Sequence, residues 1–259
     1  MPRIGIFDSG FGGLTVQRAV LDALPGADTV YLGDTARLPY GTKSAETVTQ
    51  YSLRNARFLL GQKIDLLVVA CNTASSVALP ALEREVPVPV LGVVEPGARV
   101  AAQVSRTGRI GVIGTPGTVA SGAYQAAIRR HRPDAQVIAR ACPLFVPLVE
   151  EGWTDPADEI VRGIVRRYLA PLRDSGIDAL VLGCTHYPLL AAAIAAELPG
   201  VLLVDSAEAI AEEIRLRLPA PGGRAAEHRF YVTDTPEKFL AVAGRFLGRP
   251  VDRAEHVDV

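Results

Sequence analysis

Two short apolar segments that each end in a cysteine constrain the fold of this chain most strongly. LVVACNTAS spans residues 67–75, and LVLGCTHYP spans residues 180–188. An apolar run that stops at polar residues is typical of a strand buried in a parallel sheet. Each segment therefore predicts a buried strand that carries a cysteine, Cys71 or Cys184, at its carboxyl end.

The surroundings of the two cysteines recur in the same order, which indicates an internal repeat. RIGVIGT (109–115) follows RIGIF (3–7) by 106 residues, and Cys184 follows Cys71 by 113 residues. Because βα patterns recur in both halves, we expect an α/β fold. Two pseudo-symmetric lobes, each with a parallel sheet, would face each other across a central cleft. The other predicted strands are 28–34, 65–70 and 89–94 in the first half, and 135–139, 178–183 and 201–205 in the second.

The end of the chain has no counterpart in the first half. An amphipathic helical pattern at 207–218 leads into a Pro/Gly-rich connector at 219–228, a predicted strand RFYVT and a last helix at 235–247. We expect this part to pack on the amino-terminal lobe and the polar tail after Arg249 to fray. The predicted domains are 1–96 with 207–259, carrying Cys71, and 97–206, carrying Cys184.

Composition excludes several classes of protein. The 259 residues carry 27 basic and 28 acidic side chains without a basic stripe, so we expect no nucleic-acid partner. No apolar run approaches the ~18 residues that span a bilayer, and the first residues lack the apolar core of a signal peptide. We therefore expect a cytoplasmic protein with no membrane partner. Three cysteines, an odd number, favour reduced thiols over a disulfide framework.

The segment DSGFGG (8–13) joins the first predicted strand to a helical pattern at 14–24. Backbone N–H groups of such a turn can bind an anion, but the segment matches neither G-x-G-x-x-G nor a P-loop. Asp8 also lies where a phosphate would bind, and its negative charge disfavours nucleotide binding. Glycines for a tight turn are the alternative, which does not explain a carboxylate at a strand end. We expect Asp8 and Ser9 to be site residues.

Two further loops follow predicted strands. Turn chemistry alone could explain PYG at 39–41, but a loop after a strand also borders the ligand crevice of an open parallel sheet. After Cys71, Asn72 and Thr73 are N-cap candidates for a helix over residues 72–85. A helix amino terminus favours a thiolate, so this position predicts a Cys71 pKa below about 8.5.

Cysteine serves several kinds of chemistry. A lone buried cysteine is usually a small hydrophobic residue, which is our interpretation of Cys142. A metal site of Cys71, Cys184 and His186 lacks a C-x-x-C motif, a redox disulfide lacks a resolving cysteine, and a cysteine hydrolase needs only one thiol. Two facing thiols suit inversion of a carbon stereocentre, since a base removes a proton on one face while an acid returns one on the other. Asp8 and His186 are candidates to tune or relay these protons.

The motifs FDSGFGG, PYG, CNTAS, CPLFVPLVEEG and GCTHYP together resemble the cofactor-independent glutamate racemases over nearly the whole chain. The resemblance implies the aspartate/glutamate racemase superfamily fold and conversion of L-glutamate to D-glutamate for peptidoglycan. It implies that Cys71 faces the α-proton of D-glutamate and Cys184 that of L-glutamate. It also places a glutamate near Cys184, for which EEG offers Glu150 and Glu151, and we expect Glu151. The histidine after GCT separates the chain from aspartate racemases, which tend to carry a glutamate there.

The predicted site has a catalytic and a substrate-binding set. Hydroxyl, amide and backbone N–H groups would hold the substrate carboxylates by charge-assisted hydrogen bonds. The catalytic residues are Cys71, Cys184, Asp8, His186 and Glu151, and the substrate-binding residues are Asp8, Ser9, Tyr40, Gly41, Asn72, Thr73, Thr118, Thr185 and His186.

The expected partner is a small molecule, glutamate, without a metal or cofactor. None of the three lysines lies in a context typical of a pyridoxal Schiff base. Two alternatives stay open. One is a racemase for aspartate or another amino acid on the same scaffold. The other is a non-catalytic amino-acid-binding module, which would not need the thiols. A homodimer is compatible with the sequence, which does not fix the oligomeric state.

Overall fold

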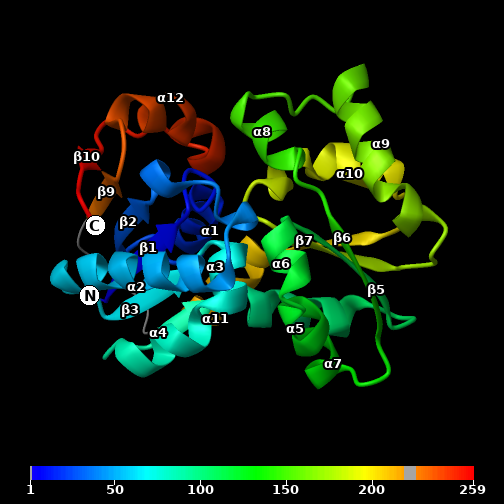
Figure 1. Ribbon diagram of the computed structural model, residues 1–259, viewed down its shortest axis with the longest axis horizontal. Helices are drawn as coiled ribbons and strands as arrows, with labels where there is room; N and C mark the ends of the chain where they lie inside the picture. The colour runs from blue at the N-terminus through cyan, green and yellow to red at the C-terminus, as the bar shows by residue number, and fades with distance from the viewer. Residues whose placement is uncertain (1, 219–225) are drawn as a thin grey trace.

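The computed structural model describes residues 2–218 and 226–259, which form two lobes, each built on a parallel β-sheet (Figure 1). The first lobe contains the sheet β10-β9-β2-β1-β3-β4, and the second lobe contains the sheet β6-β5-β7-β8. The predicted α/β class with two parallel sheets is confirmed. The strands are β1 (Arg3–Asp8), β2 (Asp28–Gly33), β3 (Leu66–Val69), β4 (Val90–Gly92), β5 (Arg109–Gly114), β6 (Gln136–Ala141), β7 (Ala179–Gly183), β8 (Leu202–Asp205), β9 (His228–Val232) and β10 (Glu255–His256).

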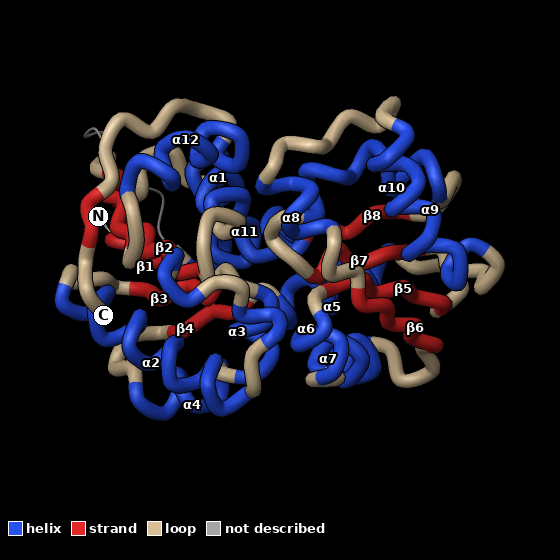
Figure 2. Tube along the Cα trace, turned by 45° about the horizontal axis from the view of Figure 1, so that its top comes forward, coloured by secondary structure: helices blue, strands red, loops and turns tan. Residues whose placement is uncertain are grey.

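Helices cover both faces of each sheet, as Figure 2 shows for the blue helices around the red strands. The first lobe carries α1 (Leu14–Ala23), α2 (Ala45–Gly61), α3 (Asn72–Val77), α4 (Leu79–Glu85) and α12 (Pro236–Leu247), with 3-10 turns η1 (Thr35–Arg37) and η2 (Tyr40–Thr42). The remaining helices are α5 (Val94–Val104), α6 (Pro116–Ala120), α7 (Ala123–His131), α8 (Phe145–Glu150), α9 (Glu159–Arg173), α10 (Ala191–Glu197) and α11 (Ser206–Arg217), with the 3-10 turn η3 (Tyr187–Leu190).

The central strands are apolar throughout because both of their faces are buried. Along β3, Val68 belongs to one core cluster and Val69 to another, as expected from the two-residue period of a strand. The cluster of Val68 also contains Leu180 and Leu182 of β7. Apolar packing is therefore continuous between the lobes.

The carboxyl-terminal part packs on the first lobe, as predicted. Strand β9 pairs in parallel with β2, and α12 lies against α1. Helix α11 contacts both α1 and α5, so it lies between the lobes. The domain boundaries near residues 96 and 206 stay a prediction. Most of the predicted connector, residues 219–225, lies outside the described residues.

Three local predictions need correction. The helix predicted over 72–85 is divided into α3 and α4 at Ala78, and the strand predicted over 89–94 ends at Gly92 because α5 begins at Val94. The tail after Arg249 does not fray. Its strand β10 pairs with β9, since an open sheet edge offers unpaired backbone groups that a short strand can satisfy.

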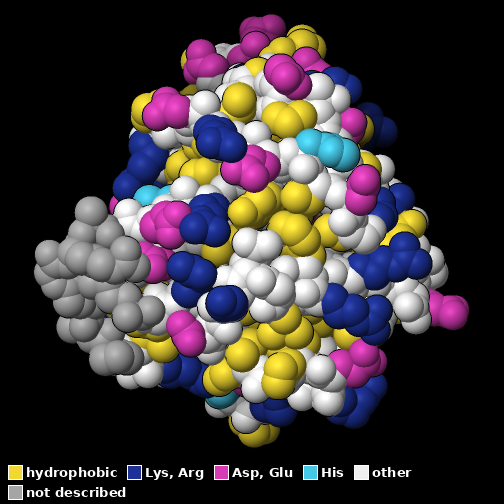
Figure 3. Space-filling model, turned by 90° about the vertical axis from the view of Figure 1, so that its left-hand side faces the viewer, with side chains coloured by type: hydrophobic (Ala, Val, Ile, Leu, Met, Phe, Trp, Pro, Cys, Tyr) yellow, Lys and Arg dark blue, Asp and Glu magenta, His cyan; other side chains and the backbone are white. Residues whose placement is uncertain are grey.

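The surface of the first lobe mixes both signs of charge, as Figure 3 shows for the side of the molecule that lies on the left in Figure 1. Among the described helices, none is long and apolar enough to cross a membrane.

Candidate active site

The predicted cysteines line one cavity between the two lobes. Its empty volume is about 410 Å³ with its open mouth included. Cys71 follows β3 and Cys184 follows β7, so each thiol comes from the carboxyl end of a central strand. The lining residues are Ser9, Gly10, Leu38, Pro39, Tyr40, Gly41, Cys71, Asn72, Thr73, Thr115, Val146, Glu150, Cys184, Thr185 and His186.

Cys71 is the N-cap residue of α3. Its Sγ accepts a hydrogen bond from the Ala74 N–H at 3.5 Å and donates to Ser9 Oγ at 3.7 Å. The sequence predicts a lowered Cys71 pKa, and that expectation is wrong for the free protein. Burial raises the pKa to about 12, and the Asp8 charge adds to this, whereas the N–H groups of α3 oppose it. Desolvation therefore outweighs the helix terminus.

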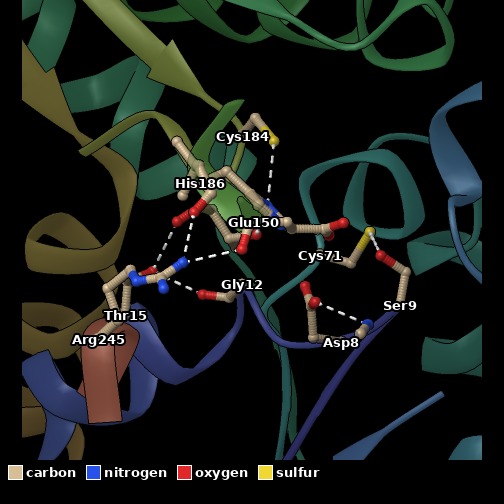
Figure 4. A network of polar contacts seen from close by, with 12 residues as sticks. Asp8, Ser9, Gly12, Thr15, Cys71, Glu150, Cys184, His186 and Arg245 are labelled. Carbon is tan, nitrogen blue, oxygen red and sulfur yellow. Dashed lines mark hydrogen bonds and ion pairs between the residues drawn. The ribbon is translucent and has the colours of Figure 1, made fainter. Parts of the chain in front are cut away.

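Cys184 lies beside a histidine–glutamate pair (Figure 4). Its Sγ is 3.8 Å from His186 Nδ1, and His186 Nε2 is 3.0 Å from Glu150 Oε1. Burial raises the pKa of the Cys184 thiol above its ordinary value, although the backbone N–H of His186 acts in the other direction. Both thiols are therefore protonated in the free protein at neutral pH.

The structure places Glu150, not the predicted Glu151, against His186. Glu150 lines the cavity, whereas Glu151 is exposed and borders a separate apolar groove with Leu144 and Trp153. The reason is helical phase, because consecutive residues project about 100° apart around a helix axis. Only one residue of the EEG motif can face His186.

Two buried polar atoms at the cavity or directly behind it have no hydrogen-bond partner among the described residues. Asn72 lines the cavity, whereas Asp8, predicted as a site residue, is fully buried and not among the lining residues. Asp8 Oδ2 accepts the Gly10 N–H at 2.9 Å, but Asp8 Oδ1 is unpaired. Asn72 Oδ1 accepts from the Tyr124 hydroxyl at 2.6 Å, which leaves Asn72 Nδ2 unpaired. A buried unpaired group costs about 1–3 kcal/mol. A ligand with a cationic donor for Asp8 and an anionic acceptor for Asn72 would remove both costs.

We expect Asp8→Asn to raise the free energy of unfolding at neutral pH. Burial raises the Asp8 pKa, against the opposing His186 charge and Gly10 N–H. A raised folded-state pKa gives stability that is present below the unfolded value and lost as pH rises through the folded value. Asparagine does not ionise, so the gain over wild type should be present at pH 7 and shrink below pH 3.8, the ordinary pKa of the group. Urea unfolding at both pH values measures it, and an unchanged or lower stability at pH 7 would contradict the assignment.

Threonine hydroxyls join the two lobes at one side of the cavity. Thr73 Oγ1 lies 2.8 Å from Thr115 Oγ1 and 3.2 Å from Thr118 Oγ1. Of the two second-lobe residues, Thr115 lines the cavity and Thr118, which was predicted to bind substrate, lies behind it. Thr115 directly follows β5 and is the N-cap residue of α6, whereas Thr118 lies within α6. This difference in position explains why Thr115 and not Thr118 lines the cavity.

Glycine at position 12 lets the loops of the two lobes meet. A Cβ there would lie 2.2 Å from Thr185 Oγ1 and 2.5 Å from His186 Nδ1, far below van der Waals contact. Thr15 Oγ1 also donates to the Thr185 carbonyl at 3.0 Å. The DSGFGG loop is therefore glycine-rich partly because the second lobe's site residues lie directly on it.

Tyr40 is predicted to bind substrate, but its hydroxyl group has partners within the first lobe. Its hydroxyl donates to Asp34 and accepts from Asn55 Nδ2 at 3.1 Å, so the hydroxyl is already paired. The Tyr40 ring and Gly41 still border the cavity. Asp34 directly follows β2, as Asp8 ends β1, so the same strand-end pattern could have indicated it.

Metal binding has no support in the described part of the chain, where no three His, Cys, Asp or Glu side chains gather suitably for a metal ion. All three cysteines are free thiols. Cys142 is buried in the apolar core and does not line the cavity.

Residues 14–214 match the sequence family described as Asp/Glu/Hydantoin racemase. Glutamate racemase of Geobacter metallireducens is 56% identical over 251 residues, covering 95% of this chain and 92% of that protein. The crystal structure of glutamate racemase isoform RacE1 from Bacillus anthracis superposes with a TM-score of 0.94 at 39% identity, covering 100% and 98% of the two chains. That of the Francisella tularensis glutamate racemase in complex with D-glutamate gives 0.91 at 36%, covering 99% and 97%. The chain therefore belongs to the Asp/Glu/Hydantoin racemase family.

Proposed function

We propose that this protein interconverts L-glutamate and D-glutamate by proton transfer at the α-carbon, with Cys71 and Cys184 as the two acid/base groups. The observation that carries the proposal is that both thiols, from corresponding strand ends of the two lobes, line one cavity. Full-length similarity to glutamate racemases supports glutamate as the substrate. The D-glutamate in the Francisella tularensis protein supports the same choice.

The unpaired polar atoms suit the zwitterionic end of an amino acid. An ammonium group would pair with Asp8 Oδ1, and a carboxylate would accept from Asn72 Nδ2. Tyr124 holds the Asn72 amide in the orientation that presents this NH2 group. Opposite charges bound at these two points would fix the α-carbon between the thiols, which is the positioning that proton transfer requires.

Each direction of the reaction needs one thiolate and one thiol. Starting from L-glutamate, the Cys184 thiolate takes the α-proton, and the Cys71 thiol returns a proton to the opposite face. In this scheme His186, whose Nδ1 is 3.8 Å from Cys184 Sγ, receives the Cys184 proton, and Glu150 stabilises the resulting imidazolium. Because burial raises both thiol pKa values, the charge of the bound ammonium group must help to stabilise the thiolate. In this scheme the two thiols carry both proton transfers at the α-carbon. Turnover from L-glutamate leaves Cys71 as the thiolate and Cys184 as the thiol, so proton exchange with solvent restores the starting pair after product leaves.

Two alternatives lead to different experimental results. A racemase for aspartate or another amino acid would use the same thiols with a different side-chain preference. A non-catalytic binding module would bind an amino acid without inverting it. The full-length glutamate racemase relatives favour glutamate, and the paired thiols favour catalysis.

We expect the purified protein to racemise glutamate in the presence of EDTA and to lose this activity when its thiols are alkylated. Bound glutamate should slow the alkylation, because it would cover both thiols. Circular dichroism of L-glutamate and L-aspartate solutions measures the turnover. Faster turnover of aspartate would favour the first alternative, and binding without turnover the second. Loss of activity on chelation, restored by zinc, would indicate a metal site instead.

D-glutamate made by this reaction would serve peptidoglycan synthesis, as the family resemblance implies. We infer a cytoplasmic location, which the three free cysteines support because thiols stay reduced there. The homodimer stays a prediction.

A further inference from the structure

Helix α12 of the first lobe contacts the His186–Glu150 pair of the second lobe with two consecutive residues. The Phe246 ring meets the His186 ring edge-to-face, with centroids 5.2 Å apart. Arg245 Nη1 donates hydrogen bonds to the Val149 carbonyl at 3.0 Å and to the Glu150 carbonyl at 2.8 Å (Figure 4). One helix thus touches both members of the pair that adjoins Cys184.

Arg245 donates hydrogen bonds to the last backbone carbonyls of α8. The last carbonyls of a helix lack partners within the helix, and an arginine side chain there can donate to them and oppose the negative end of the helix dipole. The chain turns directly afterwards at Gly152, whose φ of +84° favours glycine. A Cβ at Gly152 would lie 2.9 Å from Arg245 Nη2, so the turn lies against the guanidinium.

We infer that Arg245 is a positioning residue for the Cys184 half of the reaction, an inference that rests on the proposed function. Arg245 fixes the end of α8, the end of α8 directs the Glu150 carboxylate at His186, and His186 adjoins Cys184. Cys71 has other neighbours, Ser9 and the Ala74 N–H. The influence of Arg245 should therefore be one-sided.

The contact between Arg245 and the end of α8 joins the two lobes. Arg245 belongs to the lobe that carries Cys71, and Glu150 to the lobe that carries Cys184. The two carbonyl hydrogen bonds therefore cross from the first lobe to the second, beside the contact of Phe246 with His186. The contact links the first lobe to the geometry of one catalytic half.

Rates alone cannot reveal a one-sided effect in a racemase. The equilibrium constant between enantiomers is unity, so kcat/KM must be equal in the two directions for every variant. Primary deuterium isotope effects do separate the halves. Label at the α-carbon of L-glutamate reports the transfer to Cys184, and label in D-glutamate reports the transfer to Cys71.

We expect Arg245→Met to lower kcat in both directions by about 10- to 100-fold, the size of effect that small misplacement of a catalytic group produces. The isotope effect on kcat/KM should rise for α-deuterated L-glutamate and fall for α-deuterated D-glutamate, because the Cys184 step becomes more rate-limiting. Arg245→Lys, which keeps a donor for the carbonyls, should recover part of kcat. Arg249→Met is the matched control, since Arg249 is exposed like Arg245 but pairs with Asp22 of α1 instead.

The two proposals fail in different ways. If the wild-type protein does not racemise glutamate, the proposed function fails whatever Arg245 does. If wild type is active and Arg245→Met matches Arg249→Met, or changes both isotope effects equally, the positioning role is wrong. Thermal unfolding monitors the fold of each variant. Should Arg245→Met unfold, the isotope effects of Arg245→Lys decide, because equal values for wild type and this variant would also overturn the inference.

Discussion

Replacing Cys71 or Cys184 with serine is expected to lower kcat for glutamate racemisation by about 10²- to 10⁴-fold, the usual contribution of a general acid–base group. An alcohol is a far weaker acid than a thiol, so serine cannot supply the anionic base. KM should change much less, because the groups that we propose to hold the substrate, such as Asp8 and Asn72, stay in place. Circular dichroism of either enantiomer measures both constants.

Cys142→Ala is the control for this prediction, because Cys142 is buried but does not line the cavity. It should keep kcat near the wild-type value. A Cys142 variant as slow as the other two would indicate general damage to the fold. A Cys71 or Cys184 variant with normal kcat would remove that thiol from the mechanism.

The two serine variants should retain different partial reactions. Cys184→Ser leaves only Cys71, which we propose faces the α-proton of D-glutamate, so slow exchange of that proton with deuterated water should continue without inversion. Cys71→Ser should exchange only the α-proton of L-glutamate. Proton NMR of the α-hydrogen signal distinguishes these cases. Exchange of the same enantiomer by both variants would show that the thiols do not face opposite sides of the substrate.

The positions of the central strands and of the two thiols could be predicted because they follow from a pattern that is visible within a few consecutive residues. Buried parallel strands are apolar throughout, and polar residues at their carboxyl ends meet at a shared crevice. Cys71 and Cys184 follow this rule in both halves of the chain. The repeat therefore indicated the arrangement of the site.

Other features depend on relations that a local pattern does not contain. Whether Glu150 or Glu151 faces His186 depends on the rotation of α8, which packing against the core sets. The roles of Tyr124 and Arg245 arise from contacts between the lobes. The pKa of the Cys71 thiol was mispredicted because the helix terminus is visible in the sequence, whereas the burial that outweighs it is not.

The prediction with the clearest alternative outcomes concerns where solvent deuterium first appears. In deuterated water the free thiols carry deuterium before substrate binds. Starting from L-glutamate, the thiolate of Cys184 removes the α-hydrogen and then holds that hydrogen, whereas Cys71 delivers a deuteron to the other face. Early samples should therefore contain D-glutamate deuterated at the α-carbon, while the remaining L-glutamate is unlabelled.

The reverse experiment supplies the internal control. Starting from D-glutamate, the roles of the thiols exchange, so label should enter L-glutamate first while the remaining D-glutamate stays unlabelled. Chiral chromatography with mass spectrometry measures both pools at low conversion. A single base that removes and returns hydrogen on both faces would exchange with solvent between the two steps and label both enantiomers equally early. That result would reject the two-thiol mechanism and, with it, the catalytic interpretation of the paired strand ends, whereas label confined to the product requires two separate proton carriers on opposite faces of the cavity.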